Sequence, residues 1–239
     1  MKLLADLHVH SRASIDGRSS VEALIKAAKA RGLSAITVSD HDLCTPLPES
    51  PDLLLIPGVE ITSANGHILG LFLERPVDFS ALGRYPAPEK AIEAIHDCGG
   101  LAVLAHPFAP VKLSESEIAK LPFDAIETAN ARAMLKPNAN EKARSLAGKL
   151  HLPGTGGSDA HCEKELGGCV TEFDCEPSLP ALKAALLAGQ CSPTEVRACR
   201  WIWKGFSKLR RERNCGTCLS RCKALGYFAG CVLRDILNI

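Results

Sequence analysis

Short apolar runs that alternate with segments of helical periodicity are the feature that most limits how this chain can fold. Through about residue 190, apolar runs long enough for a strand are separated by stretches with apolar residues at helical spacing. This alternation is typical of repeated β/α units, here about seven of them, closed into a barrel. We expect strands near residues 2–8, 35–39, 53–60, 67–73, 101–105, 125–128, 152–156 and 168–173, and helices near 19–32, 88–98, 114–121, 138–150 and 178–188.

The composition is that of a soluble globular protein, with 46% hydrophobic and 23% charged residues in 239. No apolar run approaches the roughly 20 residues that a membrane span needs, and the first ten residues turn polar too soon for a signal peptide. We therefore expect a cytoplasmic protein without a membrane span. The eleven cysteines do not suggest a secreted disulfide framework, so most are expected to be reduced thiols.

The small net charge of +1 hides a strong asymmetry along the chain. Residues 1–196 contain 18 basic and 25 acidic residues, a net charge of −7, whereas residues 197–223 contain nine basic residues and one acidic residue, a net charge of +8. The alternation of strands and helices stops near Ser192 and Pro193. We therefore expect two domains, a barrel at residues 1–193 and a basic, cysteine-rich helical extension at residues 194–239.

Six of the eight histidines lie in short motifs that close or follow an apolar run, mostly with an acidic residue nearby. In β/α folds the ends of the strands gather the active site. One histidine at such a position is usually a hydrogen-bonded structural residue, but six together indicate a site for several metal ions. The motifs, one of them without histidine, are DLHVH (6–10), SDHD (39–42), GVEI (58–61), GHILG (66–70), AHP (105–107) and GSDAH (157–161).

The spacing within these motifs supports metal binding. Residues two apart in a strand point to the same side, so His8 and His10 can bind one ion. Glu60 ends an apolar run, where an unpaired carboxylate is costly to bury; a bridge between two cations would remove that cost, as would a salt bridge to a lysine or arginine. The candidate ligands are His8, His10, Asp16, His41, Glu60, His67, His106, Asp159 and His161.

Taken in order, DLHVHS, SDHD, GVE, AHP and GSDAH resemble the successive motifs of the PHP superfamily, the polymerase-and-histidinol-phosphatase metal-dependent phosphoesterases. The resemblance covers roughly residues 3–175. It implies a distorted (β/α)7 TIM-like barrel with up to three metal ions at the carboxyl ends of the strands. It also implies that His8, His10, Glu60 and Asp159 hold the first ion, Glu60, His67 and His106 the second, and Asp16, His41 and His161 the third.

Imidazole and carboxylate ligands without thiolate favour manganese, zinc or iron. Two such ions lower the pKa of a shared water to about 7, so the expected nucleophile is a metal-bridging hydroxide. Asp40, Asp159 and His161 are the candidate catalytic residues. The leaving oxygen would take its proton from Asp40, Asp42 or a histidine released from metal binding. Three arginines in expected mouth loops, Arg18, Arg84 and Arg132, are candidates for binding the substrate phosphate, although for any one of them a solvated surface arginine is the favoured interpretation.

The resemblance also bears on the substrate. Members that act on nucleotides carry a helical insertion around the second half of the barrel, whereas the segments between GVE, AHP and GSDAH are short here. This favours a small phosphorylated substrate or the open end of a polymer. The leading hypothesis is a phosphatase or phosphodiesterase, and the alternative is a nuclease for RNA or DNA ends. A regulatory module with a vestigial barrel is disfavoured, because all nine ligand positions are intact.

The basic extension predicts two helices, at residues 199–213 and from Cys218 to Leu237. The spacing of Cys215, Cys218, Cys222 and Cys231 allows a second metal site, although buried thiols in a helical hairpin are the favoured explanation. The basic residues and two tryptophans predict nucleic-acid contact, docking on the acidic barrel, or an oligomer interface. The sequence leaves the oligomeric state open.

Overall fold

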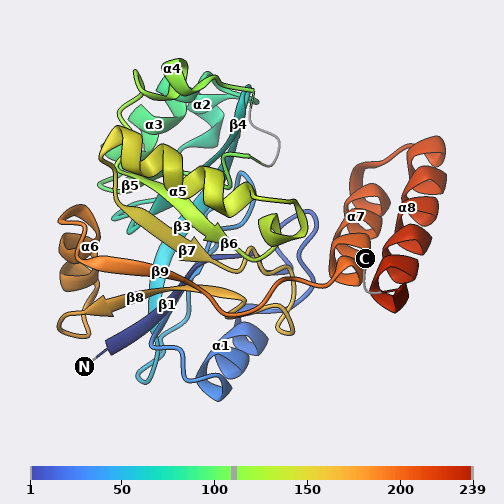
Figure 1. Ribbon diagram of the computed structural model, residues 1–239, viewed down its shortest axis with the longest axis horizontal. Helices are drawn as coiled ribbons and strands as arrows, with labels where there is room; N and C mark the ends of the chain where they lie inside the picture. The colour runs from blue at the N-terminus through green and yellow to red at the C-terminus, as the bar shows by residue number, and fades with distance from the viewer. Residues whose placement is uncertain (1, 109–111, 238–239) are drawn as a thin grey trace.

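The computed structural model describes residues 2–108 and 112–237 and contains one mixed sheet that curls into a nearly closed barrel (Figure 1). The sheet has nine strands in the order β7, β6, β5, β4, β3, β2, β1, β8, β9. The strands are β1 (Lys2–Val9), β2 (Ala35–Val38), β3 (Leu54–Ser63), β4 (Gly66–Leu71), β5 (Leu101–Leu104), β6 (Ala125–Asn130), β7 (Gly154–Gly157), β8 (Cys169–Asp174) and β9 (Cys191–Glu195).

Four of the eight pairs of neighbouring strands are parallel, as the alternating sequence pattern predicts, and the other four are antiparallel. β1, β2 and β3 form one parallel set, and β5, β6 and β7 form another. β4 lies between the two sets and is antiparallel to both of its neighbours, because a tight turn after Ser63 joins it directly to β3. The carboxyl ends of the parallel strands therefore meet at one edge, which is called the barrel mouth below.

The barrel closes at its mouth through residues that follow β7. Val9 forms a parallel bridge with Ala160, and the backbone N–H of His10 donates to the carbonyl of Ala160 at 2.7 Å. The approach is close enough to require glycine, because a Cβ on Gly157 would lie 2.5 Å from the Cβ of His8. The GTGG strand thus allows β1 and β7 to come together.

The helices cover the outside of the barrel and leave apolar side chains buried between sheet and helices. The Ser20 side chain caps α1, and Gly32, with a φ of 70°, follows its end. The barrel helices are α1 (Val21–Ala30), α2 (Phe79–Leu82), α3 (Pro88–Asp97), α4 (Glu115–Ile118), the 3-10 turn η1 (Ala133–Leu135), α5 (Ala139–Leu150) and α6 (Leu179–Leu187).

All eight expected strands are present, and the predicted barrel class with a helical extension is confirmed. Three details differ. The segment expected as a helix at 114–121 forms a single turn, α2 lies inside an expected loop, and β9 was not expected. β9 pairs antiparallel with β8, so the predicted domain boundary at residue 193 falls inside a strand, and the sheet ends at Glu195.

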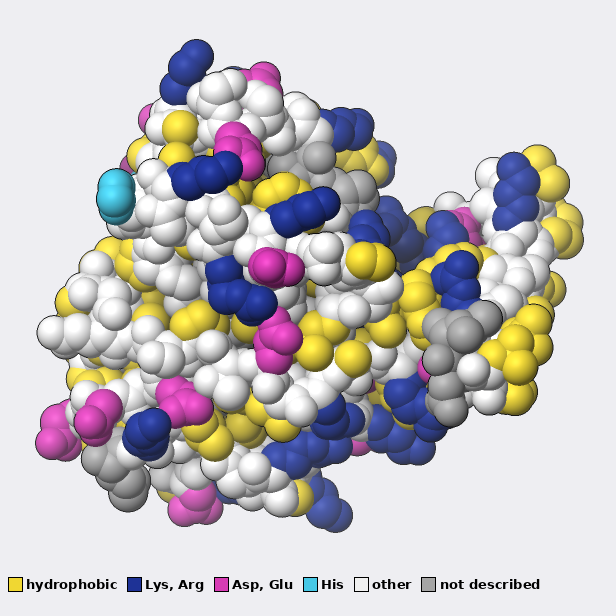
Figure 2. Space-filling model, viewed as in Figure 1, with side chains coloured by type: hydrophobic (Ala, Val, Ile, Leu, Met, Phe, Trp, Pro, Cys, Tyr) yellow, Lys and Arg dark blue, Asp and Glu magenta, His cyan; other side chains and the backbone are white. Residues whose placement is uncertain are grey.

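Helices α7 (Trp201–Cys215) and α8 (Cys218–Leu237) form a C-terminal hairpin that stands beside the barrel (Figure 1). α7 is the inner helix, and several large apolar side chains of α8 are exposed, including Leu219, Leu225, Leu233 and Ile236. Basic side chains gather where the hairpin meets the barrel, and apolar side chains line its outer edge (Figure 2). Within residues 2–108 and 112–237, no helix combines the length and apolar character needed to cross a membrane.

Candidate metal centre

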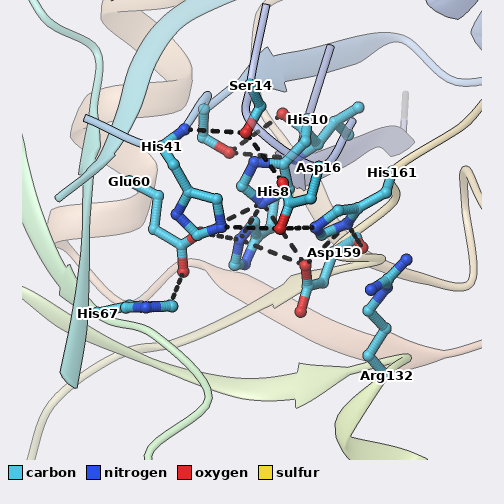
Figure 3. Close-up of polar contacts among 12 residues, drawn as sticks. His8, His10, Ser14, Asp16, His41, Glu60, His67, Arg132, Asp159 and His161 are labelled. Carbon is cyan, nitrogen blue, oxygen red and sulfur yellow. Dashed lines mark hydrogen bonds and ion pairs between the residues drawn. The ribbon is translucent and has the colours of Figure 1, made fainter. Parts of the chain in front are cut away.

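Glu60, near the middle of β3, lies at the centre of a buried cluster of imidazoles and carboxylates at the barrel mouth (Figure 3). Its two carboxylate oxygens face different histidines. Oε1 lies 2.9 Å from Nδ1 of His67 and 3.1 Å from Nε2 of His106. Oε2 lies 3.2 to 3.3 Å from nitrogens of His8, His10 and His41. The geometry is that of a carboxylate able to bridge two cations.

His8 and His10 point to the same side of β1, as their spacing predicts. Their Nε2 atoms lie 3.1 Å apart, and Oδ1 of Asp159 lies 3.8 Å from the first and 3.6 Å from the second. Asp159 follows β7 in a left-handed backbone conformation, with a φ of 54°. These three residues and Glu60 converge on a common point.

A third group of ligands forms around Asp16, in the loop after β1. Oδ2 of Asp16 lies 3.3 Å from Nε2 of His161 and 3.7 Å from Nε2 of His41. His161 donates from Nδ1 to the carbonyl of Asp159 at 2.9 Å, which leaves Nε2 as its free lone pair. The structure therefore brings all nine predicted ligands together.

Metal ions fit this donor set better than hydrogen bonds do. Nδ1 of His41 and of His67 are buried without a hydrogen-bond partner, although each lies close to Glu60. The lone pairs of these histidine nitrogens therefore converge on shared points and are not satisfied by hydrogen bonds. Buried nitrogens without a partner are costly, and divalent ions bound by imidazole and carboxylate would satisfy them.

The electrostatics of the cluster follow from burial and close opposite charge. Burial alone would raise the pKa of Glu60 and of Asp159, but the neighbouring imidazoles hold both pKa values well below their usual range. Burial opposes the charged form of His10, yet its bonds to Asp159 and Glu60 raise its pKa to about 9. Burial lowers the pKa of His41 to about 3, so this imidazole is neutral.

Glu127, on β6, supports the cluster from outside and was not expected from the sequence. Its Oε1 lies 2.9 Å from Nδ1 of His8, and its Oε2 accepts hydrogen bonds from the backbone of His106 and from the amide of Asn130. A carboxylate behind a ligating imidazole fixes the tautomer and orientation of the ring. The signal was a buried acid in the apolar run DAIETAN, the same signal that identified Glu60.

Two acidic residues near the cluster have other partners. Asp6 accepts backbone hydrogen bonds from Ser158 and Gly167, both at 2.8 Å, and so holds the segment that closes the barrel. Asp40, a candidate catalytic residue, accepts from the backbone and hydroxyl of Ser11, both at 2.6 Å, and from Thr45. Its carboxylate is fully buried in these bonds and does not line the pocket, which argues against it as the proton donor.

The three predicted phosphate-binding arginines lie in different surroundings. Arg132 lines the pocket, but both Nε and an Nη donate to Oε1 of Glu165 at 3.0 and 2.7 Å. Arg18 lies over the rings of Trp203 and Phe206 instead of facing the metal ligands. Arg84 is exposed against Tyr85 and does not line the pocket.

A pocket of about 180 Å³ opens over the cluster and is lined by Asp16, His41, Glu60, His67, His106, Asp159 and His161. Two cations of α7, Lys204 and Arg211, also line it. They lie seven residues apart and therefore on one face of the helix. The sequence showed a basic helix there but gave no signal that this face would meet the metal ligands.

Among the described residues, the four hairpin cysteines that the sequence gives as a possible second metal site are not gathered together. Within the described residues, no group of three or more potential ligands within 4.8 Å includes Cys215, Cys218, Cys222 or Cys231. Cys231 is buried and the other three are exposed. Cys218 and Cys222 lie one turn apart on α8, and the hairpin brings no third ligand to them.

Fold and donor set together define a β/α barrel with a candidate metal centre at its mouth. A model of the PHP domain matches residues 6–103, and a model of the PHP-associated region matches residues 137–191. An uncharacterised protein of Methanocaldococcus jannaschii is 32% identical over 144 residues, covering 53% of this chain and 81% of the relative. The chain belongs to the PHP family.

Solved structures share the fold at low sequence identity. A two-domain protein from Bacteroides vulgatus that contains a predicted PHP-like metal-dependent phosphoesterase has a TM-score of 0.64 and 23% identity, over 82% of this chain and 65% of that one. The lesion-specific endonuclease Q from Pyrococcus furiosus has a TM-score of 0.56 and 17% identity, over 81% of this chain and 58% of that one. This chain spans less than two thirds of either protein.

Proposed function

We propose that this protein hydrolyses phosphate esters with two or three divalent metal ions, of manganese, zinc or iron. The observation that carries the proposal is Glu60, whose two oxygens face separate sets of histidines from a fully buried position. Two ions held by one bridging carboxylate are the usual arrangement for displacement at phosphorus.

The ligand groups support the ion assignment expected from the family. His8, His10, Glu60 and Asp159 would hold one ion, Glu60, His67 and His106 a second, and Asp16, His41 and His161 a third. When bound, such ions lower the pKa of water to about 7, which provides a nucleophile at neutral pH.

The protein's own side chains would bind and orient the phosphate. Lys204 and Arg211 line the pocket, and neither forms an ion pair with a carboxylate among the described residues, so both can accept a phosphate anion. Arg132 is held by Glu165, whose other oxygen accepts from the backbone of His161 at 2.9 Å. Arg132 would therefore shape the pocket wall and position His161.

Asp159 and His161 remain the candidates for proton handling, since both line the pocket. The pocket volume of about 180 Å³ suits a phosphate group with a small substituent, so we favour a small phosphorylated substrate.

A nuclease is the second candidate. It is favoured by the structural similarity to endonuclease Q and by the unpaired cations of α7 beside the pocket. A polymer substrate would give a rate that falls steeply with salt, because its phosphates release counterions on binding.

The test begins with the metal content of protein purified without added metal. Phosphate release is then measured on small monoesters and diesters, and cleavage on single-stranded DNA and RNA, with and without manganese. We expect bound divalent metal and manganese-dependent hydrolysis of small esters. Protein that binds no metal and hydrolyses no substrate would overturn the proposal, and faster, salt-sensitive cleavage of the polymers would favour the nuclease.

A further inference from the structure

A second cavity, lined by basic residues, lies beside the metal pocket, between α7 and the loop after β1. It has a volume of about 460 Å³ and is called the arginine cavity here. α7 thus contributes to two cavities, since Lys204 and Arg211 line the metal pocket. The arginine cavity is lined by Arg18, Phe206, Leu209, Arg210, Arg213 and Asn214.

The charges of the arginine cavity are not balanced within the protein. None of its three arginines forms an ion pair with a carboxylate among the described residues, and its lining contains no acidic residue. The Nε atoms of Arg18 and Arg210 are buried without a hydrogen-bond partner. Three neighbouring guanidinium groups repel one another, and their buried donors are left unsatisfied, so an anion would relieve both costs.

Structural contacts account for only part of this arrangement. Arg210 donates to the carbonyl of Arg12 at 3.1 Å, and Asn214 donates to the carbonyl of Ile15 at 2.7 Å, which fastens α7 to the loop. The guanidinium carbon of Arg18 lies over the rings of Trp203 and Phe206, 5.2 and 4.7 Å from their centres. These contacts leave most guanidinium N–H groups of the cavity without a partner among the described residues. None of the contacts involves the Arg213 side chain.

The arginine cavity is close to the proposed reaction centre. The backbone N–H of Arg18 donates to the carbonyl of His161 at 2.8 Å, and Arg18 is two residues from Asp16. Both His161 and Asp16 are candidate ligands of the third ion. The loop after β1 therefore connects the arginine cavity to the ligand cluster.

We propose that the arginine cavity binds a second phosphate group of the substrate while the first lies over the metal centre. Arginine forks match phosphate oxygens, and three of them suit a dianionic group. This proposal rests on the proposed phosphoester hydrolysis. The second phosphate can belong to a small bisphosphorylated compound or to the next position of a nucleic-acid strand, and both present the same chemistry to the cavity.

The first experiment measures binding of inorganic phosphate to the metal-free protein by calorimetry. Arg213→Gln and Arg210→Gln should each weaken phosphate binding by about tenfold, because each removes a charge-assisted donor. Lys223→Gln, an exposed change on α8, is the matched control and should leave it unchanged. Phosphate binding that persists in the Arg210→Gln, Arg213→Gln double variant, but is lost in Lys204→Gln, would place the anion in the metal pocket instead and overturn the proposal.

The second experiment compares KM for substrates with one and with two phosphate groups. Arg213→Gln should raise KM about tenfold for two-phosphate substrates, with little change in kcat, and leave one-phosphate substrates unaffected. A bisphosphorylated sugar and a 5′-phosphorylated dinucleotide separate the two sources by which one shows the larger shift. Equal effects on all substrates would overturn the proposal. If the wild type hydrolyses none of them while its phosphate binding still depends on Arg213, the anion site stands and the proposed hydrolysis fails.

Discussion

At the barrel mouth, each carboxylate of the cluster lies within 4 Å of at least two imidazoles, whereas the five cations of α7 share one carboxylate, Glu212. Glu212 pairs with Lys208 at 2.6 Å, which leaves Lys204, Arg210, Arg211 and Arg213 without an acidic partner among the described residues. The two regions therefore lack partners of opposite charge. The mouth offers lone pairs and negative charge that cations would satisfy, and the hairpin offers positive charge that an anion would satisfy.

The two regions also meet physically. The hairpin fastens the loop that carries Asp16, and Ser207 of α7 accepts a hydrogen bond from Arg132 at 2.8 Å. A metal-bound mouth would be electropositive, and α7 adds more positive charge to one side of it. This combination suits an anionic phosphate ester that is held by metals on one side and by the hairpin on the other.

Glu60→Gln should have the largest effect, because it removes the charge that balances ions on both sides of the bridge. We expect kcat/KM to fall by at least about 100-fold and the bound metal to fall by at least one equivalent per chain. Steady-state kinetics and elemental analysis measure the two effects. Glu141→Gln, an exposed change on α5, is the control. A Glu60→Gln protein with full metal content and full activity would remove the basis for the bridged centre.

The pH dependence of metal affinity tests the mouth without mutation. The pKa of His10 is raised to about 9 in the metal-free protein, so at neutral pH a metal must displace its proton. Affinity should therefore rise with pH, by about tenfold per unit for each proton released, and level off above about pH 9. Chelator competition at pH 6.5, 7.5 and 8.5 measures it. An affinity that is flat across this range would show that the imidazoles are already neutral.

Glu127→Gln tests the support behind His8. The charge that orients this imidazole is lost while the shape of the side chain is kept, so metal affinity should fall by about 10- to 100-fold. The same chelator competition, with the melting temperature as a check on folding, gives the result. An unchanged affinity would mean that Glu127 serves only to hold the backbone of His106 and the amide of Asn130.

The ligands were predictable because their signal is local. A strand alternates its side chains with a period of two, so histidines and acids at the ends of apolar runs must face the mouth once the strands are parallel. Glu127 carried the same signal but lies outside the family motifs. Arg18 and Asp40 could not be placed, because their roles depend on partners distant in the sequence, Trp203 and Ser11.

The role of the hairpin was less predictable for the same physical reason. Helix periodicity predicted α7 and α8 with nearly correct bounds. The face of α7 that meets the mouth, however, is determined by contacts such as that of Asn214 with Ile15, more than 190 residues away in the sequence. Packing of this kind produces no periodic pattern in the sequence. The antiparallel strands β4, β8 and β9 likewise depart from the β/α alternation that the sequence pattern suggested.

Lys204→Gln tests the side of the pocket that the hairpin supplies. Removing this cation should raise KM for a phosphomonoester about tenfold, with a smaller change in kcat, because ground-state binding of the anion is lost. Lys208→Gln is the matched control on the same helix, since Lys208 is exposed and already paired with Glu212. Identical KM values for the two variants would show that α7 does not contact the substrate.

The smallest effect is expected for the exposed cysteines of the hairpin. Cys218→Ser and Cys222→Ser should leave metal content unchanged and the free energy of unfolding within about 0.5 kcal/mol of the wild type, because neither thiol is buried or gathered with other ligands. Cys231→Ser is the informative comparison. Cys231 is buried where α8 crosses α7, next to Gly205, and its thiol is hydrogen-bonded to Tyr227, so replacing it with a smaller and more polar hydroxyl should cost about 1 to 3 kcal/mol. If the exposed pair proves as costly as Cys231, or if its removal releases a metal ion, the hairpin is held by a metal and not by packing.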